Sequence, residues 1–250
     1  MSGAKKKLLV LGGTGFVGSE ICRKALLRNC EVVALSRRGQ PGAELKGQAW
    51  ANKVDWRAGS ALDPVCVGAL VPEVDAVVHS IGILLESRMN SFFSGSKSSG
   101  ENVTYEQANR DSALIPAREA LKSPRTKAFV FVSAKSAPPL LDRYLKAKRE
   151  VEAELSAYNS EELRSVFLHP GFVFHPSKGY SLPLSSVMSL GESVSSSLKK
   201  TAGIEIPGLD APTSLDLLAD AAVVACLSED VSGVLENQGM QDLVNSLEGV

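Results

Sequence analysis

The sequence is short of the features that mark several classes of protein. Its 250 residues carry 27 Lys and Arg against 28 Asp and Glu, a net charge of −1, which argues against a nucleic-acid partner. The four cysteines are scattered and show no paired spacing for zinc or disulfides, so we expect unpaired thiols in a reducing compartment. The three histidines are equally dispersed, and no metal is expected. No apolar stretch reaches the ~20 residues that cross a bilayer, so no transmembrane segment is expected.

The chain does carry a dinucleotide-binding pattern at its start. Residues 8–11 form an unbroken apolar run, typical of a strand buried on both faces, and 16–27 has apolar residues at helical spacing. Glycines in the intervening turn would let the backbone approach a pyrophosphate, and the helix N-terminus would offer it free N–H groups. A turn that needs glycine for geometry alone is the alternative. The residues predicted to contact the cofactor here are Gly12, Gly13, Thr14, Gly15, Phe16, Val17 and Gly18.

The residues after the second predicted strand, 31–36, favour NADP(H). Enzymes that prefer NAD usually have Asp or Glu about 20 residues beyond the glycines, where it binds the ribose 2′-hydroxyl. Ser36, Arg37 and Arg38 stand at that place. A guanidinium pairs with a 2′-phosphate, which a carboxylate would repel, so NAD is the less favoured cofactor. Two solvated arginines at a strand end are the alternative.

The rest of the chain alternates between strand and helix patterns. Strands are predicted at 54–57, 75–82, 127–133, 163–168 and 231–235, and helices after Asp63-Pro64 and at 103–122, 142–158 and 214–227. The alternation predicts a doubly wound parallel α/β sheet, a single NAD(P)-binding Rossmann domain over 1–250. Its less regular part, 177–250, would cap the core or line the substrate site. Residues 86–101 are predicted to form a mobile lid or a disordered insertion.

Tyr144 and Lys148 are four residues apart and share one face of the helix predicted at 142–158. A phenol with a pKa near ~10 is a poor acid or base at neutral pH, and a nearby cation lowers that pKa. Ser133 would hydrogen-bond a substrate carbonyl, and Asn109 would anchor a water that relays protons to Lys148. The Tyr/Lys spacing is common on surface helices, but after the fifth strand of such a fold it predicts a catalytic set.

These motifs together resemble the extended and atypical short-chain dehydrogenase/reductase superfamily over nearly the whole chain. The stretches that carry the resemblance are GGTGFVG, the Ser133/Tyr144/Lys148 set, Asn109, His169-Pro170-Gly171 and APTSLDLLADAAVVAC. More narrowly, VVHSIGILLE, TYEQAN, YLKAKREVEAEL and HPGFVF are similar to the atypical member associated with ubiquinone (coenzyme Q) biosynthesis in mitochondria. A near neighbour is the dehydrogenase-like accessory subunit of respiratory complex I, which holds NADPH without a known turnover.

The resemblance implies a mitochondrial location on the matrix side of the inner membrane, with chloroplast or cytoplasm as alternatives. It implies a prenylated quinone intermediate as substrate and a membrane-associated biosynthetic or respiratory complex as partner. Two functions follow from it: an NADP(H)-dependent oxidoreductase, or a nucleotide-holding structural or assembly subunit. The further cofactor contacts that it implies are Ser60, Ala61, Ser80, Ile81, Gly82, Lys148, Pro170, Gly171 and Val173.

The sequence departs from the superfamily pattern at two places. Ser60 stands where an Asp on the adenine side is common, which puts the adenine contact in doubt. His169 stands where an Arg often precedes Pro-Gly, so a charge that contacts substrate or scaffold is expected to be missing at neutral pH. Tyr144 and Lys148 are intact, so the departures weaken the binding argument more than the chemical one.

Overall fold

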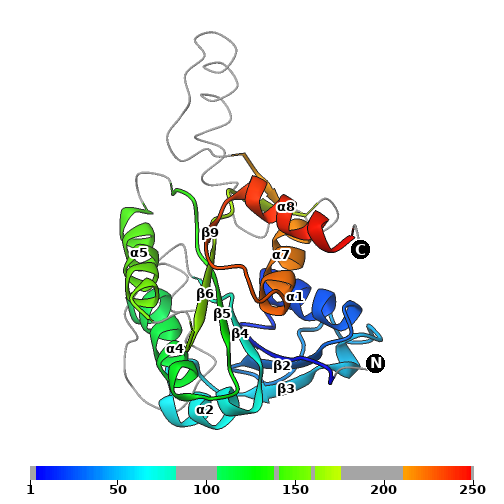
Figure 1. Ribbon diagram of the computed structural model, residues 1–250. Coiled ribbons are helices and arrows are strands. Elements are labelled where there is room, and N and C mark those ends of the chain that lie inside the picture. The colour runs from blue at the N-terminus through cyan, green and yellow to red at the C-terminus, as the bar shows by residue number, and fades with distance from the viewer. Residues whose placement is uncertain (1–3, 83–105, 138–140, 159–160, 176–210, 249–250) are drawn as a thin grey trace.

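The computed structural model describes residues 4–82, 106–137, 141–158, 161–175 and 211–248, in which strands alternate with helices (Figure 1). The elements of the first part are β1 (Lys7–Leu11), α1 (Phe16–Leu27), β2 (Glu31–Ser36), β3 (Asp55–Ala58), α2 (Pro64–Leu70) and β4 (Ala76–His79). Those of the second part are a π-helical turn (Gln107–Asp111), α4 (Ser112–Lys122), β5 (Ala128–Val132), α5 (Asp142–Ser156), β6 (Arg164–Leu168), α7 (Leu215–Leu227), β9 (Gly233–Leu235) and α8 (Asn237–Glu248). Shorter elements are 3₁₀ turns at Ala51–Lys53 and Val71–Glu73 and the paired strands β7 (Val173–Phe174) and β8 (Thr213–Ser214).

The main sheet has the strand order β3-β2-β1-β4-β5-β6-β9 in the described residues, and every neighbouring pair is parallel. β1 pairs with β2 on one side and with β4 on the other, so the direction of winding reverses between β1 and β4. In open α/β sheets this reversal opens a crevice outside the carboxyl ends of the two strands. The predicted doubly wound parallel sheet is therefore confirmed, and its crevice lies where the glycine turn follows β1.

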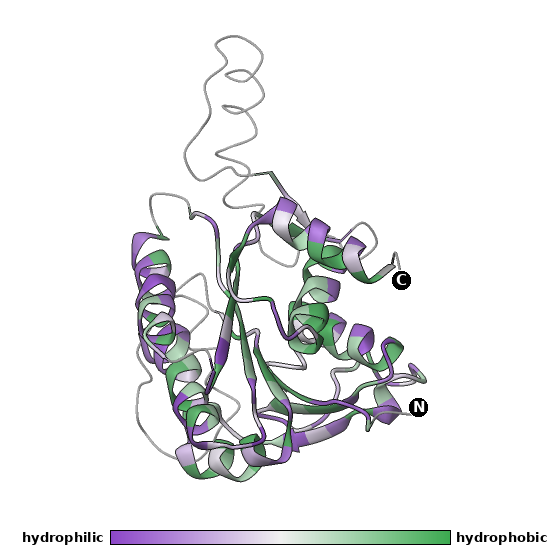
Figure 2. Cartoon of the chain, viewed as in Figure 1, coloured by the Kyte–Doolittle hydropathy of each residue, from purple (hydrophilic) through white to green (hydrophobic). Residues whose placement is uncertain are grey.

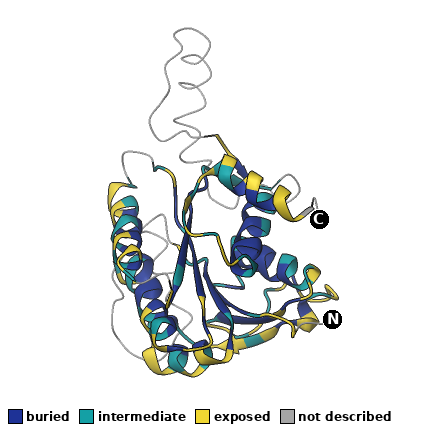
Figure 3. Cartoon of the chain, in the orientation of Figure 1, coloured by how far each residue is buried: buried dark blue, intermediate teal, exposed yellow. Residues whose placement is uncertain are grey.

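Side chains that alternate along the strands build two apolar layers, one on each face of the sheet. Leu8 and Val10 pack with α1, α7 and α8, whereas Leu9 and Leu11 pack with α2, α4 and α5. Strands covered on both faces read as continuous apolar runs, which explains the unbroken pattern of β1. Figure 2 shows the central strands β1, β2, β4, β5 and β6 together with α7 as strongly apolar, and Figure 3 shows the same parts largely buried.

The predicted elements match the observed ones closely in the N-terminal part, from β1 to β4, and less well near the C-terminus. α1 and β2 have the predicted bounds, and Asp63 caps α2 as expected by accepting a hydrogen bond from the Val65 amide. α8 is not among the predicted helices, because Gly239 and several polar residues obscure its apolar face. Met240, Leu243 and Val244, at helical spacing, bury that face in the same apolar layer as α7. The predictions for 86–101 and for residues 177–210 of the less regular part lie outside the described residues.

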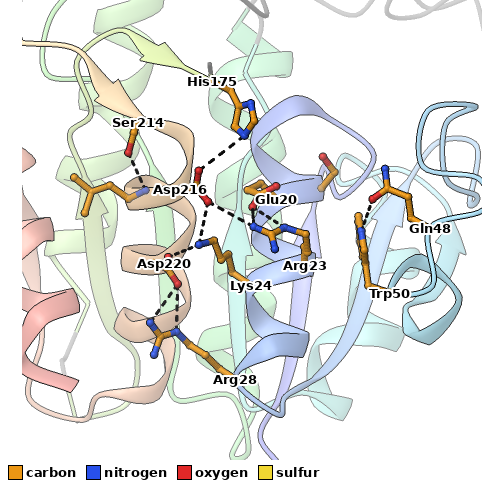
Figure 4. A network of polar contacts seen from close by, with 12 residues as sticks. Glu20, Arg23, Lys24, Arg28, Gln48, Trp50, His175, Ser214, Asp216 and Asp220 are labelled. Carbon is orange, nitrogen blue, oxygen red and sulfur yellow. Dashed lines mark hydrogen bonds and ion pairs between the residues drawn. The ribbon is translucent and has the colours of Figure 1, made fainter. Parts of the chain in front are cut away.

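A network of ion pairs fastens α7 to α1 on one face of the sheet (Figure 4). Lys24 Nζ lies 3.0 Å from Asp216 Oδ1 and 2.6 Å from Asp220 Oδ2. Arg28 Nη2 lies 3.2 Å from Asp220 Oδ1, and Arg23 pairs with the buried Glu20 on its own helix. Half-buried pairs in a network are screened less than isolated surface pairs. α7 is thus tied by charge to α1, the helix that follows the glycine turn.

Candidate functional site

The glycine turn between β1 and α1 is closely packed. Gly12 has a φ of +87°, which favours glycine, and its carbonyl oxygen accepts from the Gly15 amide at 2.8 Å. A Cβ at Gly13 would lie 2.7 Å from the Cβ of Ala34 in β2. A Cβ at Gly18 would collide with the carbonyl oxygen of Gly12. These positions hold the helix against the turn at a distance that only glycine allows.

The N-terminus of α1 is open to a ligand. Gly15 is its N-cap and provides no side-chain capping bond. The first-turn amides of a helix have no partner within it, and the helix dipole adds a partial positive charge at that end. Gly15 is exposed, and Phe16 and Val17 are half-buried. The predicted phosphate contacts therefore form a cradle whose shape and charge fit a pyrophosphate.

The turn after β4 lies directly beside the glycine turn. The backbone amide and the Oγ of Ser80 both donate to the carbonyl oxygen of Leu11, at 3.0 and 2.8 Å. A Cβ at Gly18 would lie 2.7 Å from Ser80 Oγ. Ser80, Ile81 and Gly82 therefore line the winding reversal together with the glycine turn, as expected for residues at the crevice.

Tyr144 and Lys148 of α5 come together on the other side of Gly82. A Cβ placed on Gly82 would be 3.7 Å from Tyr144 Oη and 3.7 Å from Lys148 Nζ. The Lys148 ammonium donates to the carbonyl oxygens of Val132 at 2.9 Å and Ile81 at 3.3 Å. It also lies 4.4 Å from the centroid of the Phe131 ring, within the range of a cation–π contact. One face of α5 thus presents both side chains to the crevice.

Burial shifts both side chains away from their ordinary ionisation. Tyr144 is 9% exposed, and burial raises its pKa to about 12. Lys148 is 1% exposed, and burial lowers its pKa to about 7, although the negative charge of Glu152 acts to raise it. The expectation that Lys148 lowers the pKa of Tyr144 is therefore wrong for this structure. Removal of the phenol from water outweighs any charge that the lysine contributes.

Ser133 and Asn109, the other two residues of the predicted catalytic set, are both buried. The Ser133 hydroxyl, just after β5, donates to the carboxylate of Glu152. Asn109 is fully buried in the π-helical turn, where the sequence pattern predicts a regular helix, and such turns are frequent at functional sites. The Ser112 hydroxyl donates to the carbonyl oxygen of Ala108 in the same turn, at 2.7 Å. The roles predicted for Ser133 and Asn109 stay predictions.

The residues predicted to select the cofactor lie at the ends of β2 and β3. Arg37 and Arg38 are adjacent and mostly exposed to solvent. Partial desolvation of the Arg37 guanidinium, and then the positive charge of Arg38, lower the pKa of Arg37. Ser36 Oγ accepts from the Gly39 amide at 3.2 Å and so shapes this turn. After β3, Ser60 Oγ accepts from the Leu62 amide at 3.1 Å. Ala61 is buried beside it.

The segment after β6 differs from the expectation in one respect. His169 is buried, and Nη1 of Arg149 lies 2.9 Å from its Nε2. A cation from α5 therefore lies beside His169. The expectation that a charge contacting substrate or scaffold is missing at this position stays a prediction. The Gly171 amide donates to Thr213 Oγ1 at 2.9 Å, which ties this turn to β8.

Sequence reasoning missed Glu152 and Arg149. Glu152 follows Tyr144 and Lys148 at a further interval of four, so all three fall on one face of α5. The sequence did contain a signal for Glu152, because it places a carboxylate on the face of α5 whose other residues are mostly apolar. Its meaning depends on His169 and Ser133, which come from other elements.

Two further features can be stated for the described residues. No three His, Cys, Asp or Glu side chains among them come together as a metal ion would require. None of the helices in this part of the chain combines the length and the apolar character needed to cross a bilayer.

Comparison with known proteins places the chain in a family. Residues 8–108 match the NAD dependent epimerase/dehydratase family. MIOREX complex component 2 of Saccharomyces cerevisiae is 33% identical over 202 residues, which cover 67% of this chain and 73% of the yeast protein. The chain belongs to the epimerase/dehydratase family. An uncharacterized chloroplastic protein of Arabidopsis thaliana is 30% identical over 246 residues, 92% of this chain and 74% of that protein.

Solved structures share the fold at lower sequence identity. A UDP-N-acetylglucosamine 4-epimerase from Methanobrevibacter ruminantium, in complex with UDP-N-acetylmuramic acid, has a TM-score of 0.65 at 18% identity and covers 98% of this chain and 83% of its own. The UDP-glucose 4-epimerase of Thermus thermophilus, in complex with NAD, has a TM-score of 0.63 at 20% identity, with coverage of 97% and 82%. The chain is thus a nucleotide-binding protein of the NAD-dependent epimerase/dehydratase type.

Proposed function

We propose that the protein is an NADP(H)-dependent reductase. The observation that carries this proposal is the position of Tyr144 Oη and Lys148 Nζ, both 3.7 Å from the Cβ position of Gly82. Ser80, two residues earlier, packs beneath Gly18 of the glycine turn. The phenol and the ammonium therefore border the crevice in which this family holds its dinucleotide, and the bound cofactor would supply a hydride there.

The ionisation of Tyr144 favours reduction over oxidation. Burial raises the pKa of this phenol to about 12, so it keeps its proton at neutral pH. A phenol that keeps its proton can give it to the alkoxide that forms when a carbonyl accepts a hydride, because an alkoxide is a stronger base than a phenolate, whereas oxidation of an alcohol would need the phenolate. We assign Tyr144 as the general acid in the direction of reduction.

The neighbouring residues would hold the cofactor and the substrate. Lys148 would bind the nicotinamide ribose, and Asn109 would anchor a water that returns a proton to it. Ser133 would orient the substrate carbonyl, which requires its hydroxyl hydrogen to leave the carboxylate of Glu152. Ser60 and Ala61 would contact the adenine side, and the nicotinamide side would be lined by Ile81, Gly82, Pro170, Gly171 and Val173.

Two exposed arginines support NADP(H) over NAD(H). Arg37 and Arg38 follow β2, the strand whose end faces the adenine ribose in this fold. Their guanidinium groups would pair with the 2′-phosphate, and Ser36 would add a hydrogen bond. Partial burial, and then the positive charge of Arg38, lower the pKa of Arg37. A dianionic phosphate bound beside them would therefore offset the repulsion between the two guanidinium groups.

The resemblance to the ubiquinone-biosynthesis member of the superfamily supports a substrate class and a location. We propose that the substrate is a prenylated quinone-ring intermediate and that the protein works on the matrix side of the mitochondrial inner membrane. Its single domain would present the C-terminal part, from residue 177, to that substrate. The yeast relative is named as a component of a complex, which supports a membrane-associated complex as partner.

A second candidate function is a nucleotide-holding subunit without turnover. The name of the yeast relative favours it, and so does the state of the Tyr144–Lys148 pair. The Lys148 ammonium is already bonded to two backbone carbonyls, and neither pKa is shifted toward activation of the phenol. In this function the same glycines would bind the nucleotide, and Tyr144 and Lys148 would only order it.

Three experiments test these proposals. Calorimetric titration should give tighter binding of NADPH than of NADH, and equal or absent affinity for both would contradict NADP(H) as the cofactor. Tyr144→Phe should still bind NADPH but lose turnover and fail to complement a strain that lacks the protein. Full complementation by Tyr144→Phe would favour the nucleotide-holding subunit. Gly15→Trp, which blocks the phosphate cradle, should impair both functions.

A further inference from the structure

A buried polar cluster lies beneath α5 at the carboxyl ends of β5 and β6. Its members are Ser133, Arg149, Glu152 and His169, and Glu152 is the acceptor that the others share. Oε1 of Glu152 lies 2.6 Å from Arg149 Nη1 and 2.9 Å from His169 Nε2, and the Ser133 hydroxyl donates to it as well. Glu152 is 8% exposed. This carboxylate is therefore held in one place by groups from three elements.

The same carboxylate is coupled to the Tyr144–Lys148 pair through α5 and β5. Tyr144, Lys148 and Glu152 follow one another at intervals of four, with Lys148 between the phenol and the carboxylate. Lys148 donates to the carbonyl oxygen of Val132, and the next residue, Ser133, donates to Glu152. Two consecutive residues at the end of β5 thus fasten two consecutive turns of α5.

A buried ammonium requires compensation for its lost hydration. The partners of Lys148 Nζ are neutral: two backbone carbonyls and the ring of Phe131. Of the groups that face it, Tyr144 on α5 is a neutral phenol, and His79 on β4 is kept neutral because burial, and then the charge of Lys148, lowers its pKa. Glu152 is the anion among them. Its carboxylate contacts Arg149 of α5, Ser133 after β5 and His169 after β6. Lys148 lies one helical turn before it on the same face of α5, and the negative charge of Glu152 acts on it.

We propose that Glu152 is a positioning residue for the Tyr144–Lys148 pair, whose buried negative charge keeps the Lys148 side chain an ammonium ion near neutral pH. The proposal concerns the ionisation of the protein itself, and its consequence for proton transfer rests on the proposed reductase function. The state of the carboxylate agrees with it. Burial acts to raise the pKa of Glu152, but the bonds from His169 and Ser133 and the charge of Arg149 hold it below its usual range.

Removal of the Glu152 charge and damage to the packing around it would shift the pKa of Lys148 in opposite directions, which makes the proposal testable. Glu152→Gln keeps the size of the side chain but removes its charge, so the pKa of Lys148 should fall further from its value of about 7. Loosened packing that admits water would instead move that pKa up, toward its ordinary value. A purely structural cluster therefore predicts no change or a rise.

The experiment is a pH titration of the Lys148 Nζ resonance in protein labelled with ¹⁵N-lysine, assigned with Lys148→Arg. For Glu152→Gln we expect the midpoint to move to lower pH by about one unit, the low end of the effect of a nearby opposite charge. The matched control is Glu150→Gln, which removes a more exposed carboxylate of the same helix, paired with Arg110, and should leave the midpoint unchanged. An unchanged or raised midpoint in Glu152→Gln would overturn the proposal.

A reciprocal measurement keeps the proposal testable if Glu152→Gln does not fold. Coupling between two charges acts equally on both, so the carboxyl pKa of Glu152 should rise in Lys148→Met, read from its ¹³C side-chain resonance. An unchanged carboxyl titration there would contradict the coupling. Both titrations use the protein without nucleotide. Failure of NADPH to bind would refute the proposed function and leave these results standing.

Discussion

At the residue scale, the glycines of the phosphate turn and the charged groups around it carry different parts of the function. Gly12, Gly13 and Gly18 set how closely the turn, the helix and β2 approach one another. Arg37 and Arg38 would set which dinucleotide is preferred. The first role depends on van der Waals contact within the protein, whereas the second depends on charge presented to a ligand, so substitutions separate them.

Gly18→Ala is expected to lower both the stability and the dinucleotide affinity of the protein. The added Cβ would meet the Gly12 carbonyl oxygen and lie 2.7 Å from Ser80 Oγ, and neither turn can withdraw without widening the cradle. Overpacking of this kind costs ~1–3 kcal/mol of the free energy of unfolding, measured by chemical denaturation. Gly42→Ala is the control, since its Cβ would approach only the Glu44 side chain, at 3.8 Å. Equal stability of the two variants would contradict the packing argument.

The double substitution Arg37→Gln/Arg38→Gln is expected to weaken NADPH binding and to leave NADH binding unchanged. Hydrogen bonds to a charged group are worth ~1.5–3 kcal/mol, so the dissociation constant for NADPH should rise roughly 10- to 100-fold. Arg57→Gln removes another exposed arginine, on β3 and paired with Asp55, and should change neither affinity. A parallel loss for both dinucleotides would show that the arginines do not read the 2′-phosphate.

Much of the site could be predicted at this scale, because its motifs are local. The glycine spacing and the Tyr144–Lys148 spacing can each be recognised within a few consecutive residues of one turn or one helix. The direction in which the pKa of Tyr144 shifts could not be predicted, because it depends on burial by residues that are far apart in the sequence. Glu152 was missed for the same reason, since its partners come from the ends of β5 and β6.

At the element scale, α7 links the C-terminal part of the chain to the nucleotide half. Its buried face packs on the sheet with α1, and the pairs of Lys24 and Arg28 with Asp220 hold the two helices together. Its first turn is capped by Ser214, whose Oγ accepts from the Leu217 amide at 3.1 Å. The predicted start of this helix is thus confirmed, with Ser214 in the capping role.

Ser214→Ala is expected to lower the free energy of unfolding by ~1 kcal/mol, the usual cost of a lost N-cap. The Leu217 amide would lose its partner at a helix end that is half-buried. Ser214→Gly should cost only a few tenths of a kcal/mol, because glycine is itself acceptable at the N-cap and leaves room for water. Denaturation curves of the two variants give the comparison. A larger loss for glycine than for alanine would contradict the capping role.

At the scale of the whole molecule, the site exists because the sheet brings separate segments to one crevice. β1 and β4 are neighbours in the sheet, and the hydrogen bond from Ser80 to Leu11 at their carboxyl ends joins residues 69 positions apart in the chain. α5 then adds its Tyr144–Lys148 face from beyond β5. The burial of Lys148 at the crevice also changes how the free energy of unfolding depends on pH.

The free energy of unfolding of the protein, relative to that of Lys148→Met, is expected to fall as the pH drops from about 10.5 to about 7. The native pKa of Lys148 is lowered to about 7 from an ordinary value of 10.5, so in this window the unfolded chain holds a proton here that the native protein lacks. The difference in unfolding free energy should therefore increase with pH by up to ~1.4 kcal/mol per pH unit, and level off below and above the window. Denaturation at several pH values measures it, and parallel pH curves would contradict the shift.

The sequence by itself determined the order of the main strands and helices as far as α7, the glycine turn and the spacing that puts Tyr144 and Lys148 on one helix face. Those features depend on local periodicity and on residues close together in the chain. Only the tertiary structure decided that this face meets Gly82, that Arg149 supplies the cation beside His169, and that burial sets the ionisation of the phenol and the lysine. These outcomes depend on which distant segments exclude water from a group, and a linear pattern does not contain that information.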